Sequence, residues 1–191
     1  MLIELNLWIF LLLLGAGILG TLLAAMRPTE NHLKKALFFG LLLAVCDFLF
    51  ENVGALKGLW FTSGSAWFMF GLFVPVEVFL IAAMAGIAFY LVFPPHKNAL
   101  YILSSALLIA AAGIGIEAIL IDHALLTYAN GWTSYQALAS YFSMFVLLHL
   151  VSLKVHGMRI LHQDERVEYE HPRTGKVLVL TKGSSFAKKK R

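Results

Sequence analysis

"ALYILSSALLIAAAGIGIEAILI", residues 99–121, decides the fold class, because Glu117 is its only charged side chain. A run of about 20 apolar residues is what an α-helix needs to cross the hydrocarbon core of a bilayer. Such a run must be helical in lipid, since lipid offers the backbone N–H and C=O groups no hydrogen-bond partner. The segment therefore predicts a transmembrane helix.

Four further segments meet the same test of length and apolarity. The predicted spans are residues 5–26, 34–53, 67–93, 99–121 and 134–153. The composition agrees, because 60% of the residues are hydrophobic and 14% are charged, against roughly half and a quarter in soluble domains. The chain begins "MLIELNLW", without an early basic residue, so we expect the first run to be a retained span rather than a signal peptide. We expect an all-α helical membrane bundle.

The basic residues predict the orientation of the bundle. Arg27, Lys34 and Lys35 lie between the first two spans, and most of the remaining Lys and Arg lie from Lys154 onward, whereas the alternate loops contain only Lys57. Loops rich in Lys and Arg stay in the cytoplasm. The prediction is a five-span domain, residues 1–153, with the N-terminus outside, and a basic cytoplasmic tail, residues 154–191. Alternating residues in "RVEYEHPRTGKVLVL" predict a short β-hairpin in that tail.

Acidic residues within the predicted spans are candidates for function. A charge near the bilayer centre costs about 2.5–3.5 kcal/mol on insertion scales, so such residues usually face a protein interior. Asp47 and Glu51 are four residues apart and share one helix face. Glu77 lies about ten residues into its predicted span, which is near mid-membrane. We expect these three and Glu117 to line one cavity near Trp60, and we expect Asp122 to lie at an exposed helix end.

Two loop segments resemble each other. "ENVGALKGLW" and "DHALLTYANGW" each carry an acidic residue nine or ten positions before a tryptophan, Trp60 or Trp132. The match favours a shared pocket near these tryptophans. Aromatic side chains are also common where membrane spans meet water, so the interface alone explains the two positions equally well.

The segments "DFLFENVGALKGLW", residues 47–60, and "GLFVPVEVFLIAAMAG", residues 71–86, are similar to the membrane-integral lycopene cyclase domain. The resemblance extends over about residues 45–93, and its matching positions occur in the family's order. They are Asp47, Gly58, Trp60, Pro75 and Glu77. The family has a second glutamate directly after the first, where this chain has Val78.

The resemblance implies a membrane enzyme that cyclises or isomerises an isoprenoid or carotenoid by acid-initiated carbocation chemistry. It implies that Glu77 is the acid, that Asp47 or Glu51 is the base, and that no cofactor takes part. The expected substrate-binding residues are Trp60, Glu117, Trp132 and Pro75. The expected partners are a lipophilic isoprenoid or lipid substrate, the bilayer, and further subunits in a homo- or hetero-oligomer, and nucleic acid is not expected. The expected location is the plasma membrane of a prokaryote.

Two alternatives stay open. A non-catalytic lipid-binding or assembly subunit would carry the same polar residues inside a bundle, because small residues in "AGIGIEA" and "AAMAG" let helices pack closely. A membrane sterol isomerase would use similar acid chemistry among aromatic residues. Di-iron hydroxylases are excluded, because the seven histidines do not form the clusters that bind the iron pair.

Overall fold

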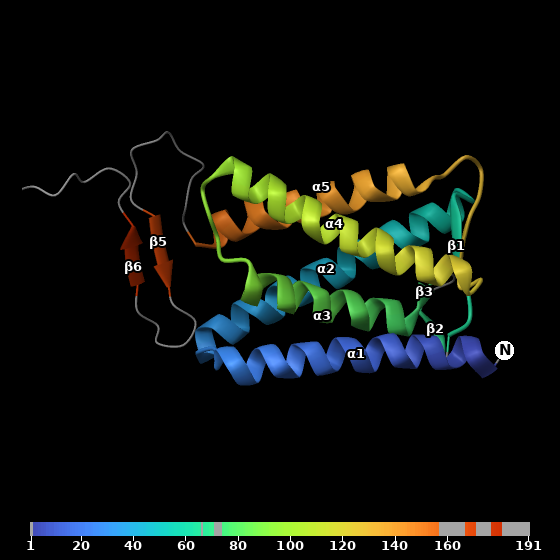
Figure 1. Ribbon diagram of the computed structural model, residues 1–191, viewed down its shortest axis with the longest axis horizontal. Coiled ribbons are helices and arrows are strands. Elements are labelled where there is room, and N and C mark those ends of the chain that lie inside the picture. The colour runs from blue at the N-terminus through green and yellow to red at the C-terminus, as the bar shows by residue number, and fades with distance from the viewer. Residues whose placement is uncertain (1, 66, 71–73, 157–166, 171–176, 181–191) are drawn as a thin grey trace, which may run out of the picture.

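The computed structural model describes residues 2–65, 67–70, 74–156, 167–170 and 177–180. Five helices run up and down beside one another (Figure 1), as the all-α class predicted. They are α1 (Leu2–Met26), α2 (Glu30–Leu56), α3 (Val76–Val92), α4 (Ala99–Asp122) and α5 (Ser134–Val155). The short strands are β1 (Trp60–Thr62), β2 (Met69–Phe70), β3 (Val74–Pro75), β4 (Leu126–Tyr128), β5 (Val167–Glu170) and β6 (Val177–Leu180).

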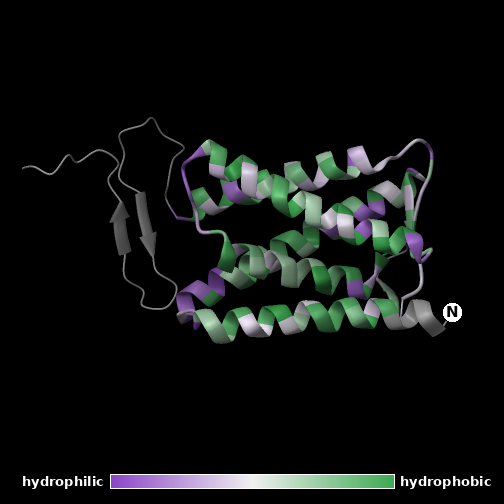
Figure 2. Cartoon of the chain, in the orientation of Figure 1, coloured by the Kyte–Doolittle hydropathy of each residue, from purple (hydrophilic) through white to green (hydrophobic). Residues whose placement is uncertain are grey.

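The helices have the length and composition of membrane spans, with one exception. Within the described residues, α1, α2, α4 and α5 are long and apolar enough to cross a bilayer. Hydrophobic residues cover the middle of the helices, and hydrophilic residues gather toward their ends (Figure 2). The exception, α3, has 17 residues. At 1.5 Å per residue it is about 26 Å long, slightly shorter than the hydrocarbon core.

The prediction of one continuous helix over residues 67–93 is wrong in its first part. Met69–Phe70 pairs antiparallel with Val74–Pro75, so the chain enters α3 through extended segments. Pro75 is the N-cap of α3. Proline lacks a backbone N–H and disfavours helical geometry in the residue before it, which explains why the helix begins at Val76. Glu77 therefore lies in the first turn of α3, not at mid-span.

Helices α2 and α4 end with the same backbone motif. Gly58 and Ala124 have φ angles of 65° and 57°, in the left-handed region. The next residue after each donates its N–H back into the helix, Leu59 to the Gly54 carbonyl and Leu125 to the Leu120 carbonyl, each at 2.9 Å. This is the Schellman arrangement, which satisfies the last carbonyls of a helix and reverses the chain. Each reversal leads directly into a strand.

Those strands, β1 and β4, join the two parts of the bundle. They pair antiparallel with Trp60 opposite Tyr128 and Thr62 opposite Leu126. Trp8 on α1 adds to this end of the molecule, because its indole N–H donates to the Ser63 carbonyl at 2.9 Å. In the tail, β5 pairs with β6, with Val167 opposite Leu180, which confirms the antiparallel pairing predicted there.

The tightest helix contact is between α2 and α3. A Cβ atom added at Gly86 would lie 2.5 Å from the Phe39 carbonyl oxygen and 2.9 Å from the Gly40 Cα. Only glycine permits the two backbones to approach this closely. Around this contact lies the main apolar core, which includes Phe39, Phe89, Tyr90, Phe145 and Leu148. This contact fixes the position of α3 against α2. Asp47 and Glu51 lie farther toward the C-terminal end of α2.

Gly86→Ala should destabilise the protein by about 1–3 kcal/mol, because the added methyl group overpacks a backbone contact that cannot shift. Thermal unfolding in detergent measures the effect. Gly20→Ala is the matched control, since a Cβ at Gly20 in α1 would meet nothing within 4 Å. Equal unfolding temperatures for the two variants would contradict the close approach of α2 and α3.

Candidate functional site

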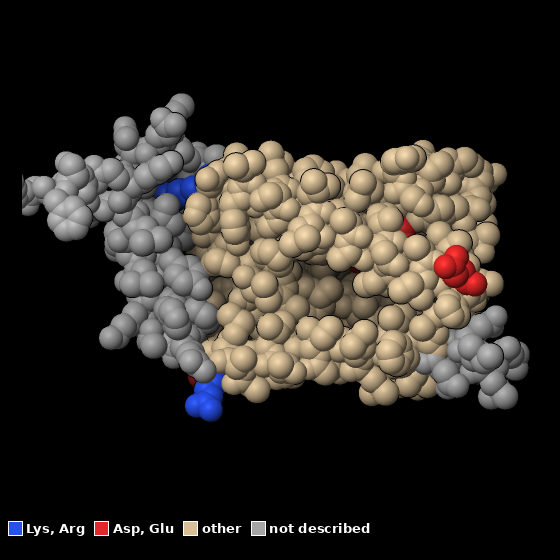
Figure 3. Space-filling model, in the orientation of Figure 1, with Lys and Arg blue, Asp and Glu red and all other residues tan. Residues whose placement is uncertain are grey.

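A cavity of about 410 Å³ lies between the helices and reaches the β1–β4 pair. Figure 3 shows a hollow on the face of the molecule between α1 and α4. Side chains from all five helices and from both strands line the cavity, and most of them are apolar. The lining residues with acidic, hydroxyl or indole groups are Trp8, Asp47, Glu51, Trp60, Thr62, Glu117, Tyr128, Trp132, Ser140 and Tyr141. No Lys, Arg or His of the described residues lines it.

Glu51 is held by an aromatic cluster. Its carboxylate accepts a hydrogen bond of 2.9 Å from the Trp60 indole N–H. The buried Trp60 ring packs against Trp132, with ring centroids 4.5 Å apart, and against Phe50 at 4.8 Å. A Cβ at Gly54 would lie 2.0 Å from the Trp60 ring, so this glycine leaves the space that the indole occupies. Trp60 and Trp132 thus lie beside the cavity, as the sequence predicted.

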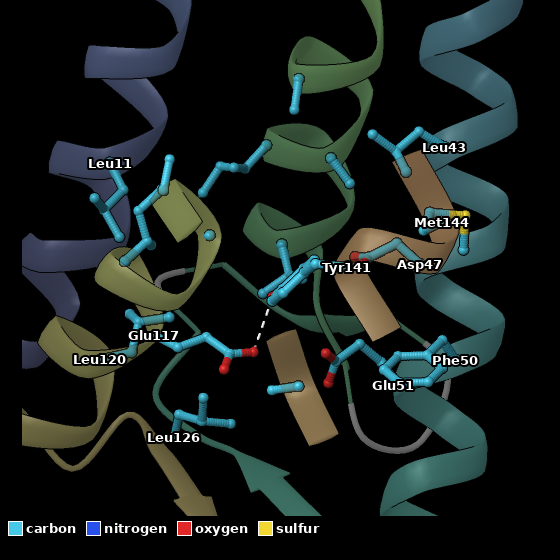
Figure 4. Close-up of a pocket in the computed structure, with 18 of the residues that line it drawn as sticks. Leu11, Leu43, Asp47, Phe50, Glu51, Glu117, Leu120, Leu126, Tyr141 and Met144 are labelled. Atoms are coloured by element: carbon cyan, nitrogen blue, oxygen red, sulfur yellow. Dashed lines mark hydrogen bonds between the residues drawn. The ribbon is translucent and has the colours of Figure 1, made fainter. Parts of the chain in front are cut away.

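Glu117 is held by two tyrosines. Its carboxylate accepts hydrogen bonds from the hydroxyl of Tyr141 at 2.9 Å and from the hydroxyl of Tyr128. Burial and the hydrogen bond to Glu117 raise the pKa of Tyr128, so this hydroxyl stays protonated and remains a donor. Figure 4 shows Glu117 and Glu51 extending from opposite sides toward a common space beside Tyr141. The two glutamates therefore face one another across the cavity.

Asp47 differs from the two glutamates in its partners. It lines the cavity one helical turn before Glu51, and within the described residues no group donates a hydrogen bond to its carboxylate. Its charge interacts unfavourably with the charges of Glu51 and Glu117. Like charges in an apolar space are costly unless a proton or a positive group compensates them. The arrangement suits a ligand that receives a proton or carries positive charge between the three acids.

The two glutamates occupy equivalent positions in the chain. Glu51 lies seven residues before the left-handed residue Gly58, and Glu117 lies seven residues before Ala124. The loop comparison in the sequence paired Glu51 with Asp122, and the structure corrects that pairing. Asp122 is exposed at the end of α4, as expected, so the acid that matches Glu51 is Glu117.

Glu77 lies elsewhere, so the expectation that it shares the cavity is wrong. It does not line the cavity, and neither does Pro75. The Glu77 side chain is fully buried and accepts hydrogen bonds from the Ser65 hydroxyl at 2.9 Å and from the Trp67 backbone N–H at 3.2 Å. The cause is the late start of α3, which places the carboxylate beside the preceding loop. A carboxylate in the first turn also interacts favourably with the helix dipole.

Sequence reasoning missed the tyrosine donors. Tyr141 belongs to a face of α5 that also presents Ala137, Ser140 and Met144 to the cavity. This spacing of three, one and three residues is typical of one face of a helix. A search for polar residues on the faces of the fifth span would have found Tyr141. Tyr128 carries no comparable signal, because its contact depends on how β1 and β4 pair.

The acidic residues are arranged around open space rather than gathered at one point. Within the described residues, no three His, Cys, Asp or Glu side chains are close enough together to hold a metal ion. The arrangement leaves room for a ligand between the carboxylates. Comparison of the chain with protein-family models, curated proteins and solved structures finds no match.

Gly54→Ala should displace the Trp60 ring and break its hydrogen bond to Glu51. The cost should be about 1–3 kcal/mol, the usual range for leaving a buried polar group unpaired. The near-UV circular dichroism of the tryptophans should change, and the unfolding temperature should fall. Gly115→Ala is the control, since a Cβ there would meet nothing within 4 Å. An unchanged tryptophan signal in Gly54→Ala would contradict the packing of Trp60 on α2.

Proposed function

We propose that the protein is a membrane enzyme that protonates an apolar isoprenoid and lets the resulting carbocation isomerise or close a ring. The observation that carries this proposal is a set of three carboxylates in an apolar cavity whose described lining has no basic residue. Such chemistry needs an acid, an environment that tolerates positive charge, and a base. The resemblance to the lycopene cyclase domain supports the same reaction class.

Asp47 takes the role of the acid in this proposal. Its carboxyl group faces the cavity without a hydrogen-bond donor among the described residues, so its proton is available to a ligand. Proton transfer from Asp47 to a terminal carbon–carbon double bond leaves a carbocation on the ligand and a carboxylate on Asp47. Glu77 does not fit this role, because its carboxylate is engaged with the loop at Ser65 and Trp67.

Stabilisation of the cation is assigned to the aromatic cluster and Glu51. The rings of Phe50, Trp60 and Trp132 lie against one another at the cavity. A cation held over an aromatic face in a site without water gains about 2 kcal/mol. The carboxylate of Glu51 adds a negative charge beside these rings. Both effects are larger for the carbocation than for the neutral ligand, which is the condition for catalysis.

Glu117 is assigned the role of the base. Loss of a proton from the carbon next to the cation forms the new double bond, and the Glu117 carboxylate accepts that proton. The hydroxyls of Tyr128 and Tyr141 stabilise the negative charge of this carboxylate before the transfer. One proton enters the ligand and one leaves it, so the reaction is redox-neutral and its balance requires no hydride carrier.

The proposal includes insertion of the five helices in a membrane with the N-terminus outside. Because the helices alternate in direction, Arg27, Lys34, Lys97 and Lys154 fall at one end of the bundle. Figure 3 shows basic residues at that end. The positive-inside rule assigns this end to the cytoplasm. Glu51 and Glu117, each five residues before the end of its helix, then lie in the outer half of the membrane.

Asp47→Asn should lower product formation by about 10²–10⁴-fold, the usual contribution of general acid catalysis, because asparagine keeps the shape and lacks the proton. The measurement is pigment analysis after expression in a host that accumulates lycopene, where the active protein should yield a cyclised or isomerised carotenoid. Expression of folded protein should be unchanged.

Two variants serve as controls for that experiment. Asp122→Asn should keep full activity, since Asp122 is exposed at the end of α4. Glu77→Gln should lower the unfolding temperature while the folded fraction keeps its turnover, since Glu77 holds a loop. Loss of turnover in Glu77→Gln without loss of stability would favour Glu77 as the acid. A wild-type protein that binds the pigment without converting it would favour the non-catalytic binding alternative.

Cysteine labelling tests the orientation. After Cys46→Ser, a cysteine at Ser63 should react with a membrane-impermeant reagent added outside intact cells, because Ser63 is exposed at the end of the bundle assigned to the outside. A cysteine at Lys97, between α3 and α4, should react only after the cells are opened. Reaction of both positions in intact cells would contradict the orientation.

A further inference from the structure

We infer that the side opening of the cavity between α1 and α4 is a binding site for the chain of a neutral, linear hydrocarbon, whose end reaches the three carboxylates. This inference rests on the proposed function for the reaction at that end. The binding itself is tested separately from any turnover.

Six described residues line the cavity and are also exposed: Phe50 on α2, Ala85 on α3, and two residues on each of α1 and α4, which mark the opening. On α1 these are Leu14, 48% exposed, and Ile18, 54% exposed. On α4 they are Ala112 and Ile116, of which Ile116 is 45% exposed. Each pair is four residues apart and so lies on one face of its helix. The two apolar faces form the edges of a side opening, at the hollow seen in Figure 3.

The cavity is closed along the helix axes. At one end the buried side chains of Trp60 and Leu126 on the β1–β4 pair cover it. At the other end Leu43 and Phe145 line it, and both belong to the main apolar core. A ligand therefore enters from the side, between α1 and α4, rather than from either end of the bundle.

The opening lies at the level of the membrane interior. Leu14 is near the midpoint of the 25-residue helix α1, and Ala112 is near the midpoint of the 24-residue helix α4. Glu117 is five residues beyond Ala112, which is about 7.5 Å along the helix axis. A ligand that enters from the hydrocarbon core extends its end over that distance to reach the acids. The rest of a long chain stays between α1 and α4 and in the lipid.

The charge of the lining selects against an anionic ligand, and the apolar edges of the side opening select against one that is already charged before it enters. A phosphate or diphosphate group buried here would meet three carboxylates, and no Lys, Arg or His of the described residues lines the cavity. An uncompensated buried charge costs several kcal/mol. The lining therefore excludes prenyl diphosphates and favours a hydrocarbon end that gains its charge only on protonation.

Binding of diphenylhexatriene, a neutral linear conjugated hydrocarbon, tests this site in the full-length protein. The probe should quench the fluorescence of Trp60 and Trp132 by energy transfer, and the quenching should saturate. Ala112→Phe and Leu14→Phe, one on each edge of the opening, should weaken binding at least tenfold because the added rings fill the entrance. Ala111→Phe and Leu13→Phe are the matched controls, since these neighbouring exposed residues do not line the cavity.

The outcomes separate this inference from the proposed function. Equal affinity of the probe for the edge and control variants would overturn the side opening. Binding of a prenyl diphosphate as tight as that of the probe would overturn the selection of a neutral chain. Competition by phospholipid at equal affinity would overturn the selection of a neutral chain. Saturable probe binding that is lost in the edge variants and kept in the control variants would support the binding site. If the wild-type protein then converted no pigment, only the proposed reaction would be contradicted.

Discussion

The pairing of β1 with β4 joins the two parts of the helical body at the end where the acidic residues lie. The two parts are α1 to α3 and α4 with α5, and away from the strands they share the main apolar core, where Phe89 on α3 packs against Phe145 and His149 on α5. The register places Trp60 opposite Tyr128, and each donates a hydrogen bond to the glutamate of the helix before its own strand. A shift of one residue would turn these side chains to the other face. This short ladder therefore sets both the width of the cavity and the partners of its two glutamates.

Hydropathy predicted four of the helices closely and failed at the start of α3. Aromatic and aliphatic residues in 67–75 are as apolar as those of a membrane helix, so composition alone did not distinguish them from the helix that follows. The local signal was Pro75, because proline begins helices more readily than it continues them. Glu77, two residues later, is an acidic residue of the kind that favours the first turn of a helix. Giving these signals more weight than hydropathy would have placed the helix start correctly.

The candidate site was predictable where it depends on local spacing. Asp47 and Glu51 share a helix face by their separation of four residues, and the structure places both at the cavity with Glu117. Contacts between distant segments were not predictable in the same way. Tyr141 reaches Glu117 across 24 positions of the chain, and only the packing of α4 on α5 brings them together. The prediction that Glu77 lines the cavity failed for a local reason, because its predicted depth in the membrane depended on an incorrect start of α3.

Asp47 and Glu77 show how the same functional group takes different roles inside one bundle. Glu77 is fully buried, yet a hydroxyl and a backbone N–H donate to its carboxylate, so hydrogen bonds offset the cost of its burial. Asp47 faces an apolar cavity near two other acids, and no described group donates to it. Asp47 is half-buried, and the described residues supply no hydrogen bond that would offset the loss of water around its carboxyl group. Under the proposed function, a ligand in the cavity would complete the hydrogen bonding that the described residues leave open at Asp47.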